Sequence, residues 1–136
     1  MEALYQEASL LSSKVVTNCY STSFSLGIKA LGNEIHDPIY AIYGFVRLAD
    51  EIVDTFHQQD KKPLLDEFVN ETNLAIKRKL SLNPVLHSFQ WAVNKYSIEQ
   101  ELIDAFIKSM EWDLSKTEYT RAEYEEYIYG SAEVVG

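Results

Sequence analysis

The chain has 136 residues, of which 46% are hydrophobic, and its 21 acidic residues against 12 Lys and Arg give a formal net charge of -9. This length and composition are typical of a globular domain with a real core and exclude a disordered chain. The acidic balance excludes nucleic acid as the expected partner, because a phosphate backbone would be repelled overall.

Few turn residues interrupt the chain, which contains only five Gly and three Pro, so long helices are expected. The first helix should cover residues 2 to about 19, because apolar residues recur there at helical spacing. This apolar stripe consists of Leu4, Ala8, Leu11 and Val15. A hydroxyl-rich break follows at residues 20–25, since Ser and Thr compete for backbone hydrogen bonds, and a short helical piece should then run to about Leu31.

Two polar residues followed by proline predict further helix starts. Asp37 precedes Pro38, and Asn83 precedes Pro84. This order favours a side-chain cap with proline at the first helical position. The helix that begins at Pro38 should run to about His57.

The remaining helices are predicted from apolar spacing and from capping boxes. Apolar residues repeat at helical spacing between about Leu64 and Leu80. Ser97 and Thr120 are each followed three residues later by Gln or Glu, and such boxes predict helix starts. The helix after Ser97 should carry an apolar stripe of Leu102, Ile103, Phe106, Ile107 and Met110. About six helices and no strand result, so we expect an all-α fold in which residues 1–136 belong to a single domain.

The most informative segment is the helix predicted after Pro38, because it carries a polar stripe that spans a sector of about 60°. The stripe consists of Tyr43, Arg47, Asp50 and Asp54. The two aspartates lie one turn apart, so their carboxylates can converge on the same cations. Like charges at this spacing repel each other, which favours a cationic ligand.

An apolar arc about 120° wide adjoins the polar stripe on the same helix. The acids therefore border the buried face, a position that suits the wall of a cavity. The alternative is an ordinary solvated helix, on which aspartates four residues apart are common and Arg47 is a surface partner of Asp50.

Several motifs resemble the phytoene/squalene synthase family. Residues 21–24 (STSF) are similar to the family's hydroxyl-rich segment, and residues 47–54 are similar to its R-x-x-D-x-x-x-D motif. Asp113 matches the acid that ends a G-M-x-x-D-like helix. Residues 127–136 resemble the family's Y-x-x-x-V-A-G-x-V-G helix, although residues 131–133 depart from it.

The resemblance implies an isoprenoid-synthase-type helical bundle, of which this chain would be the N-terminal portion. Members of the family are considerably longer, and their second D-x-x-x-D motif lies beyond the region matched here. Because no equivalent motif occurs in residues 1–136, we expect a chain truncated before the second aspartate-rich motif, with little or no activity by itself.

The family joins two molecules of farnesyl or geranylgeranyl diphosphate head to head, giving a squalene- or phytoene-like product in isoprenoid and carotenoid biosynthesis. The resemblance implies that Asp50 and Asp54 hold Mg²⁺, since oxygen ligands suit magnesium better than zinc. Arg47 would contact the diphosphate as a fixed fork, and Tyr43 would lie near the developing cation. The implied substrate-binding residues are Ser21, Ser23, Phe24, Arg47 and Tyr127. Helix capping is the alternative role for the serines, and core packing for the aromatic residues.

Mg²⁺ is thus the expected cofactor, with NADPH required only for a squalene-type product. The expected partner is a prenyl diphosphate, whose lipid nature implies peripheral contact with a membrane. Apolar faces opened by truncation would favour self-association.

A different class of function is a non-catalytic helical binding or assembly module of the same fold, and the intact acid pair argues against it. The D-x-x-x-D spacing disfavours a terpenoid synthase of the D-D-x-x-D type.

We expect the protein in the cytoplasm. The single cysteine excludes an intrachain disulfide framework. No run approaches the ~18 apolar residues that would span a bilayer. The first residues carry two acids and no Lys or Arg, unlike a secretory signal.

Overall fold

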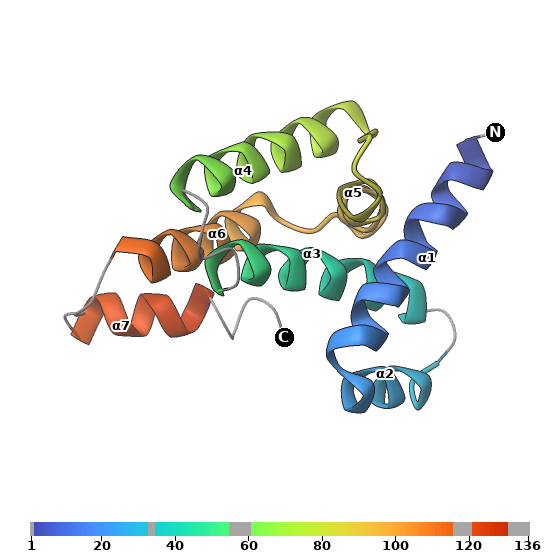
Figure 1. The fold of residues 1–136 in the computed structure, drawn as a ribbon, viewed down its shortest axis with the longest axis horizontal. Coiled ribbons are helices and arrows are strands. Elements are labelled where there is room, and N and C mark those ends of the chain that lie inside the picture. Colours follow the sequence, from blue (N-terminus) through green and yellow to red (C-terminus); the bar gives the residue numbers. More distant parts are fainter. Residues whose placement is uncertain (1, 33–34, 55–60, 116–120, 131–136) are drawn as a thin grey trace. The chain divides into compact units, whose positions relative to one another are not determined.

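The computed structural model describes residues 2–32, 35–54, 61–115 and 121–130, apart from the side chains of residues 22–25, 115, 121, 123, 124 and 127. Within these ranges the chain forms seven α-helices and no strand (Figure 1), which confirms the predicted all-α class. The helices are α1 (Glu2–Tyr20), α2 (Thr22–Lys29), α3 (His36–Asp54), α4 (Lys61–Arg78), α5 (Pro84–Tyr96), α6 (Gln100–Ser115) and α7 (Arg121–Ile128). Among the described residues, no helix is both long and apolar enough to cross a bilayer.

The chain divides into two compact units. The first consists of Met1–Leu48 and Glu71–Ser97, and the second of Ala49–Asn70 and Ile98–Gly136. Helices α3 and α4 each contribute residues to both units. The expectation of a single domain stays a prediction.

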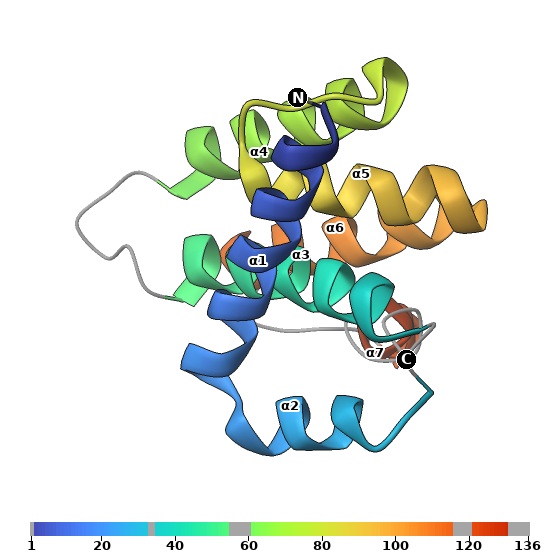
Figure 2. The same cartoon turned by 90° about the vertical axis from the view of Figure 1, so that its right-hand side faces the viewer.

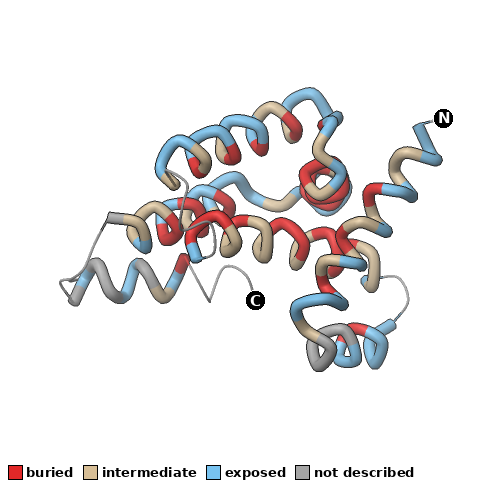
Figure 3. The backbone as a smooth tube through the Cα atoms, in the orientation of Figure 1, coloured by how far each residue is buried: buried red, intermediate tan, exposed pale blue. Residues whose placement is uncertain are grey.

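The core of the first unit is built around an aromatic pair. The rings of Phe45 (α3) and Phe89 (α5) stack with their centroids 3.8 Å apart and their planes 6° from parallel. Both side chains are buried, as are most residues of α5, which is drawn red in Figure 3. Asn94 of α5 also donates to the carbonyl oxygen of Ile76 in α4 at 3.3 Å. Aromatic stacking between α3 and α5 and one side-chain hydrogen bond between α5 and α4 therefore connect three helices of this unit.

Helix α1 has the predicted length but buries an unexpected face. Its predicted apolar stripe is exposed: Leu4, Leu11 and Val15 retain 61%, 52% and 59% of their accessible surface. The buried residues are instead Ser9, Ser13 and Thr17. These side chains are small, which lets the neighbouring helices approach closely.

The close approach involves both α5 and α3, which α1 crosses (Figure 2). The hydroxyl oxygens of Ser13 and Ser88 are 2.6 Å apart in a buried hydrogen bond. A Cβ atom placed on Gly44 of α3 would lie only 2.8 Å from Ser13 Oγ. A larger residue at either place would push the helices apart, so size rather than hydrophobicity decides which face of α1 is buried.

One of the two predicted proline-associated caps is confirmed. Asn83 Oδ1 accepts hydrogen bonds from the backbone N–H groups of Val85 and Leu86, with Pro84 at the start of α5. The cap at Asp37 is wrong, because α3 begins at His36 and Asp37 lies within its first turn. There the carboxylate pairs with Lys14 of α1 at 3.1 Å. Its negative charge is also stabilised by the positive end of the α3 dipole.

The predicted capping box at Ser97 is also wrong. Ser97 ends α5 with φ 53°, and its N–H donates to the carbonyl oxygen of Val93. A residue in this left-handed conformation cannot also adopt the extended conformation of an N-cap, and α6 begins only at Gln100. The second box falls on Thr120, which lies outside the described residues.

Helix α4 begins and ends earlier in the sequence than predicted. It covers Lys61–Arg78 and stops short of Leu80. Lys79 takes a φ of 60°, in the left-handed region that favours glycine, and Leu80 N–H donates to the carbonyl oxygen of Ala75 at 3.3 Å. This arrangement satisfies a terminal carbonyl group and turns the chain away from the helix axis.

The second unit buries the predicted apolar stripe of α6. Its buried residues include Ile103, Phe106, Ile107 and Met110. Helix α7 lies against α6, where a Cβ atom on Gly130 would overlap the carbonyl oxygen of Ala105. Lys108 of α6 also pairs with Glu126 of α7 at 2.6 Å.

Candidate functional site

Helix α3 carries the whole predicted polar stripe, and its burial agrees with the prediction that the stripe borders the core. The apolar arc is largely buried, with Phe45, Ala49, Ile52 and Val53 exposed by 7% or less. Tyr43, Arg47 and Asp50 are half-buried, and Asp54 is exposed. Both carboxylates can therefore be reached from solvent, while their helix is anchored by its apolar side.

The acid pair lies at the C-terminal end of α3, where Lys61 Nζ of α4 donates to the carbonyl oxygen of Val53 at 2.5 Å. Asp54 is the last residue of α3, and the last turn contains no basic residue. Acids at a helix C-terminus oppose the helix dipole, and the neighbouring charge of Asp50 adds repulsion. In the described ranges no three His, Cys, Asp or Glu residues gather as metal ligands. Two carboxylates one helical turn apart thus offer oxygen ligands from one helix.

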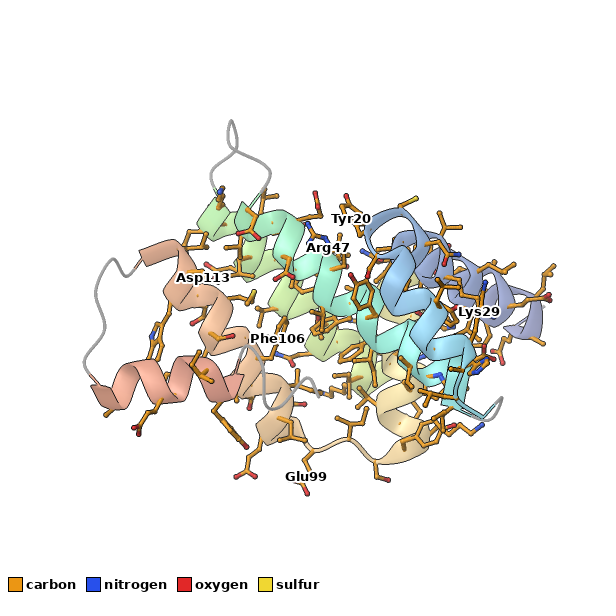
Figure 4. The ribbon with its side chains drawn as sticks, turned by 90° about the horizontal axis from the view of Figure 1, so that it is seen from below. Tyr20, Lys29, Arg47, Glu99, Phe106 and Asp113 are labelled. Atoms are coloured by element: carbon orange, nitrogen blue, oxygen red, sulfur yellow. The ribbon has the colours of Figure 1, made fainter. Side chains whose placement is uncertain are left out.

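Arg47 is positioned by an aromatic ring that the sequence analysis missed. Its guanidinium carbon lies 4.3 Å from the centroid of the Tyr20 ring, the last residue of α1 (Figure 4). Such a cation–π contact restrains the side chain. Residues so far apart in the sequence give no periodic signal, and only the place of Tyr20 directly before the STSF motif hints at its role. The exposed Cys19 precedes it.

Ser21 lies at the junction of α1 and α2, next to the residue that contacts Arg47. Its backbone N–H donates to the carbonyl oxygen of Thr17 at 2.8 Å, and its side chain is half-buried. Within the first unit, Ser21 of the hydroxyl-rich motif therefore directly follows the residue whose ring contacts Arg47.

Three predicted substrate-binding side chains fall outside the described residues. Ser23 and Phe24 are on α2, and Tyr127 is on α7, but only their backbones are described. Their proposed contacts stay predictions. Asp113 is exposed on α6 in the second unit (Figure 4).

A family model of squalene/phytoene synthases matches residues 17–136. The chain belongs to the squalene/phytoene synthase family. This family is of the prenyltransferase type, and the matched range contains both the STSF segment and the R-x-x-D-x-x-x-D segment of α3. Among curated proteins, none matches the chain significantly.

The structure is similar to the crystal structure of squalene synthase HpnC from Alicyclobacillus acidocaldarius. The TM-score is 0.85 at 20% sequence identity, and the match covers 97% of this chain. This likeness establishes the fold and confirms the predicted isoprenoid-synthase-type helical bundle. The chain spans 50% of the length of that structure's chain, and the expectation that it is the N-terminal portion of such a bundle stays a prediction.

Proposed function

We propose that the complete protein joins two prenyl diphosphates head to head, and that α3 supplies one of its diphosphate-binding walls. The observation that carries the proposal is the stripe of Arg47, Asp50 and Asp54 on one helix, beside a buried apolar arc. Membership of the squalene/phytoene synthase family supports it. Farnesyl and geranylgeranyl diphosphate are the proposed substrates.

Asp50 and Asp54 fit Mg²⁺ by their donor chemistry. Magnesium prefers carboxylate oxygens, retains several waters and is completed by substrate phosphates, so this carboxylate pair would supply the protein ligands on one wall. Bound there, it would supply positive charge to the oxygens of a departing diphosphate. NADPH is proposed only for a squalene-type product, and a cytoplasmic location stays a prediction.

Arg47 would bind the diphosphate from the same helix. Its planar guanidinium matches two phosphate oxygens at once, and the Tyr20 ring holds it before substrate arrives. Less side-chain freedom is then lost on binding. The hydroxyl of Ser21, at the adjoining helix junction, would add a neutral donor to the same group.

The aromatic residues would serve the apolar part of the reaction. An allylic cation is stabilised by ring faces without being trapped by a nucleophile. Tyr43, half-buried one turn before Arg47, is proposed for this role. Phe24 and Tyr127 are proposed for it by family resemblance alone.

The test is Mg²⁺-dependent turnover of farnesyl and geranylgeranyl diphosphate by the complete gene product. Asp50→Asn should lower kcat at least about 100-fold, since a neutral amide cannot hold the positive charge that the leaving group needs. Asp104→Asn is the matched control, because this exposed α6 carboxylate accepts from Gln100 Nε2 at 2.8 Å and lies outside the stripe. Activity of Asp50→Asn close to that of the control would contradict the proposal. A wild-type protein that binds but never consumes either substrate would favour the non-catalytic module.

A further inference from the structure

The junction of α4 and α5, in the first unit, gathers positive charge in an acidic chain. Lys77, Arg78 and Lys79 are consecutive and exposed, although acids outnumber basic residues 21 to 12 in the whole sequence. In the described part of the chain no carboxylate pairs with any of them. Lys79 occupies a left-handed position that glycine would fill with less strain. We call residues 77–82 the α4–α5 corner.

Two leucines project from this corner. Leu80 is 53% exposed, and Leu82, at 92%, is the most exposed large hydrophobic residue described. Their exposure is imposed by the residue between them, because Ser81 is buried and held from several sides. Its carbonyl oxygen accepts from the Tyr5 hydroxyl at 2.5 Å, and its N–H donates to His87 Nδ1 at 3.2 Å. The corner therefore presents its leucines on a fixed backbone.

A cavity of about 900 Å³ opens beside the corner within the same unit. Its lining includes Arg78, Lys79 and Lys95, against one carboxylate from Glu2. Lys95 Nζ lies 5.2 Å from the Trp91 ring centroid, so an aromatic face and cations share this rim. Room for an anionic head group is therefore present next to the projecting leucines.

An exposed pair of leucines flanked by cations, in which Leu80 also borders the cavity, is complementary to an anionic bilayer. Lipid phosphates attract clustered Lys and Arg, and an apolar side chain gains by entering the boundary between head groups and acyl chains. A folded protein partner would instead need a pocket shaped to two protruding leucines. The exposed leucines and the adjacent positive charge together favour the lipid surface.

We propose that the α4–α5 corner docks the protein on an anionic membrane, with its two leucines inserted and its cations on the lipid phosphates. This inference names a surface for peripheral membrane contact and goes beyond the proposed reaction. It needs no turnover for its test, so its failure leaves the catalytic proposal untouched.

The test is co-sedimentation of the complete protein with vesicles of phosphatidylcholine alone and of phosphatidylcholine with phosphatidylglycerol. Binding is expected only to the anionic vesicles and should fall with ionic strength. Leu82→Asn should weaken binding about tenfold by loss of apolar insertion. Lys77→Gln with Lys79→Asn should weaken it about 25-fold, since each cation near such a surface is worth about fivefold.

Matched controls come from α2 of the same unit. Leu26, 62% exposed, and Lys29 are like the corner residues in type but lie away from its cation cluster, so Leu26→Asn and Lys29→Gln should bind as the wild type does. Far-UV circular dichroism and thermal melting monitor folding. A purely structural role of the cations at the end of α4 would change melting and leave vesicle binding intact.

The proposal is overturned if wild type ignores anionic vesicles or if the corner and control variants bind equally. It is also overturned if light scattering shows a dimer that Leu82→Asn dissociates, because the corner would then be an interface between copies.

Discussion

Helices α1 and α3 are equally long, at 19 residues each, yet they bury opposite kinds of surface. In α3 the apolar arc is in the core and the polar stripe borders it, as hydrophobic periodicity predicts. In α1 a row of hydroxyl residues is buried and the leucines are exposed. The contrast shows that periodicity identifies a helix more reliably than it identifies the face that packs.

The physical reason lies in what each helix meets. Phe45 of α3 faces another large aromatic ring, and area burial dominates such a contact. Ser13 of α1 faces Gly44 and Ser88, where short distances and a hydrogen bond between hydroxyls matter more. Burying a hydroxyl is tolerable when it finds such a partner.

The largest effect that separates the two helices should come from truncating one apolar residue on each. Phe45→Ala is expected to lower the free energy of unfolding by about 3–5 kcal/mol, since it removes half of a buried stack. Leu11→Ala should cost less than about 0.5 kcal/mol because its side chain is half-exposed. Urea denaturation of both variants measures the difference. Equal losses would mean that the α1 stripe is covered in solution.

A smaller change in stability is expected from replacing two glycines by alanine, and its sign should differ between the two positions. Gly44→Ala should destabilise the fold by about 1–3 kcal/mol, because the new methyl group would press on Ser13. Gly27→Ala should stabilise it by up to about 1 kcal/mol, since that position in α2 has open space and alanine is the better helix former. Thermal denaturation of the two variants and the wild type measures both changes in stability. Stabilisation by Gly44→Ala would refute the close approach of α1 and α3.

The smallest effect concerns pH. Burial lowers the pKa of His87, whose ring lies 4.5 Å from that of Tyr5 on α1. The unfolded chain therefore binds a proton more readily than the folded one, so stability should fall as pH drops below about 6.5. His87→Asn, which retains an acceptor near the Nδ1 position, should flatten this slope between pH values of about 7.5 and 5.5. A wild-type protein with the same free energy of unfolding at the two pH values would contradict the predicted role of His87.

Much of the fold could be predicted because local signals and tertiary packing agree. The Asn83–Pro84 start and the α6 stripe depend on neighbouring residues alone, and both are confirmed. Ser97 misled because the same residue can start one helix or end another, and only the backbone conformation decides. Lys79 ends α4 where glycine would be expected, so composition gave no stop signal.

The residues of the candidate site that share one helix could be predicted, whereas the contact between residues of two helices could not. The order of Arg47, Asp50 and Asp54 along α3 follows from the helical repeat alone. The contact of Arg47 with Tyr20 depends on how α1 and α3 pack, and packing here is set by small residues that carry no hydrophobic signal.

Cys19 offers an experimental consequence of this packing. It is the chain's only cysteine, it is exposed, and it directly precedes the ring on which Arg47 rests. Within residues 1–136 a thiol-reactive fluorophore would therefore label a single position without engineered residues, and its emission would report ligand occupancy beside the arginine in a simple titration.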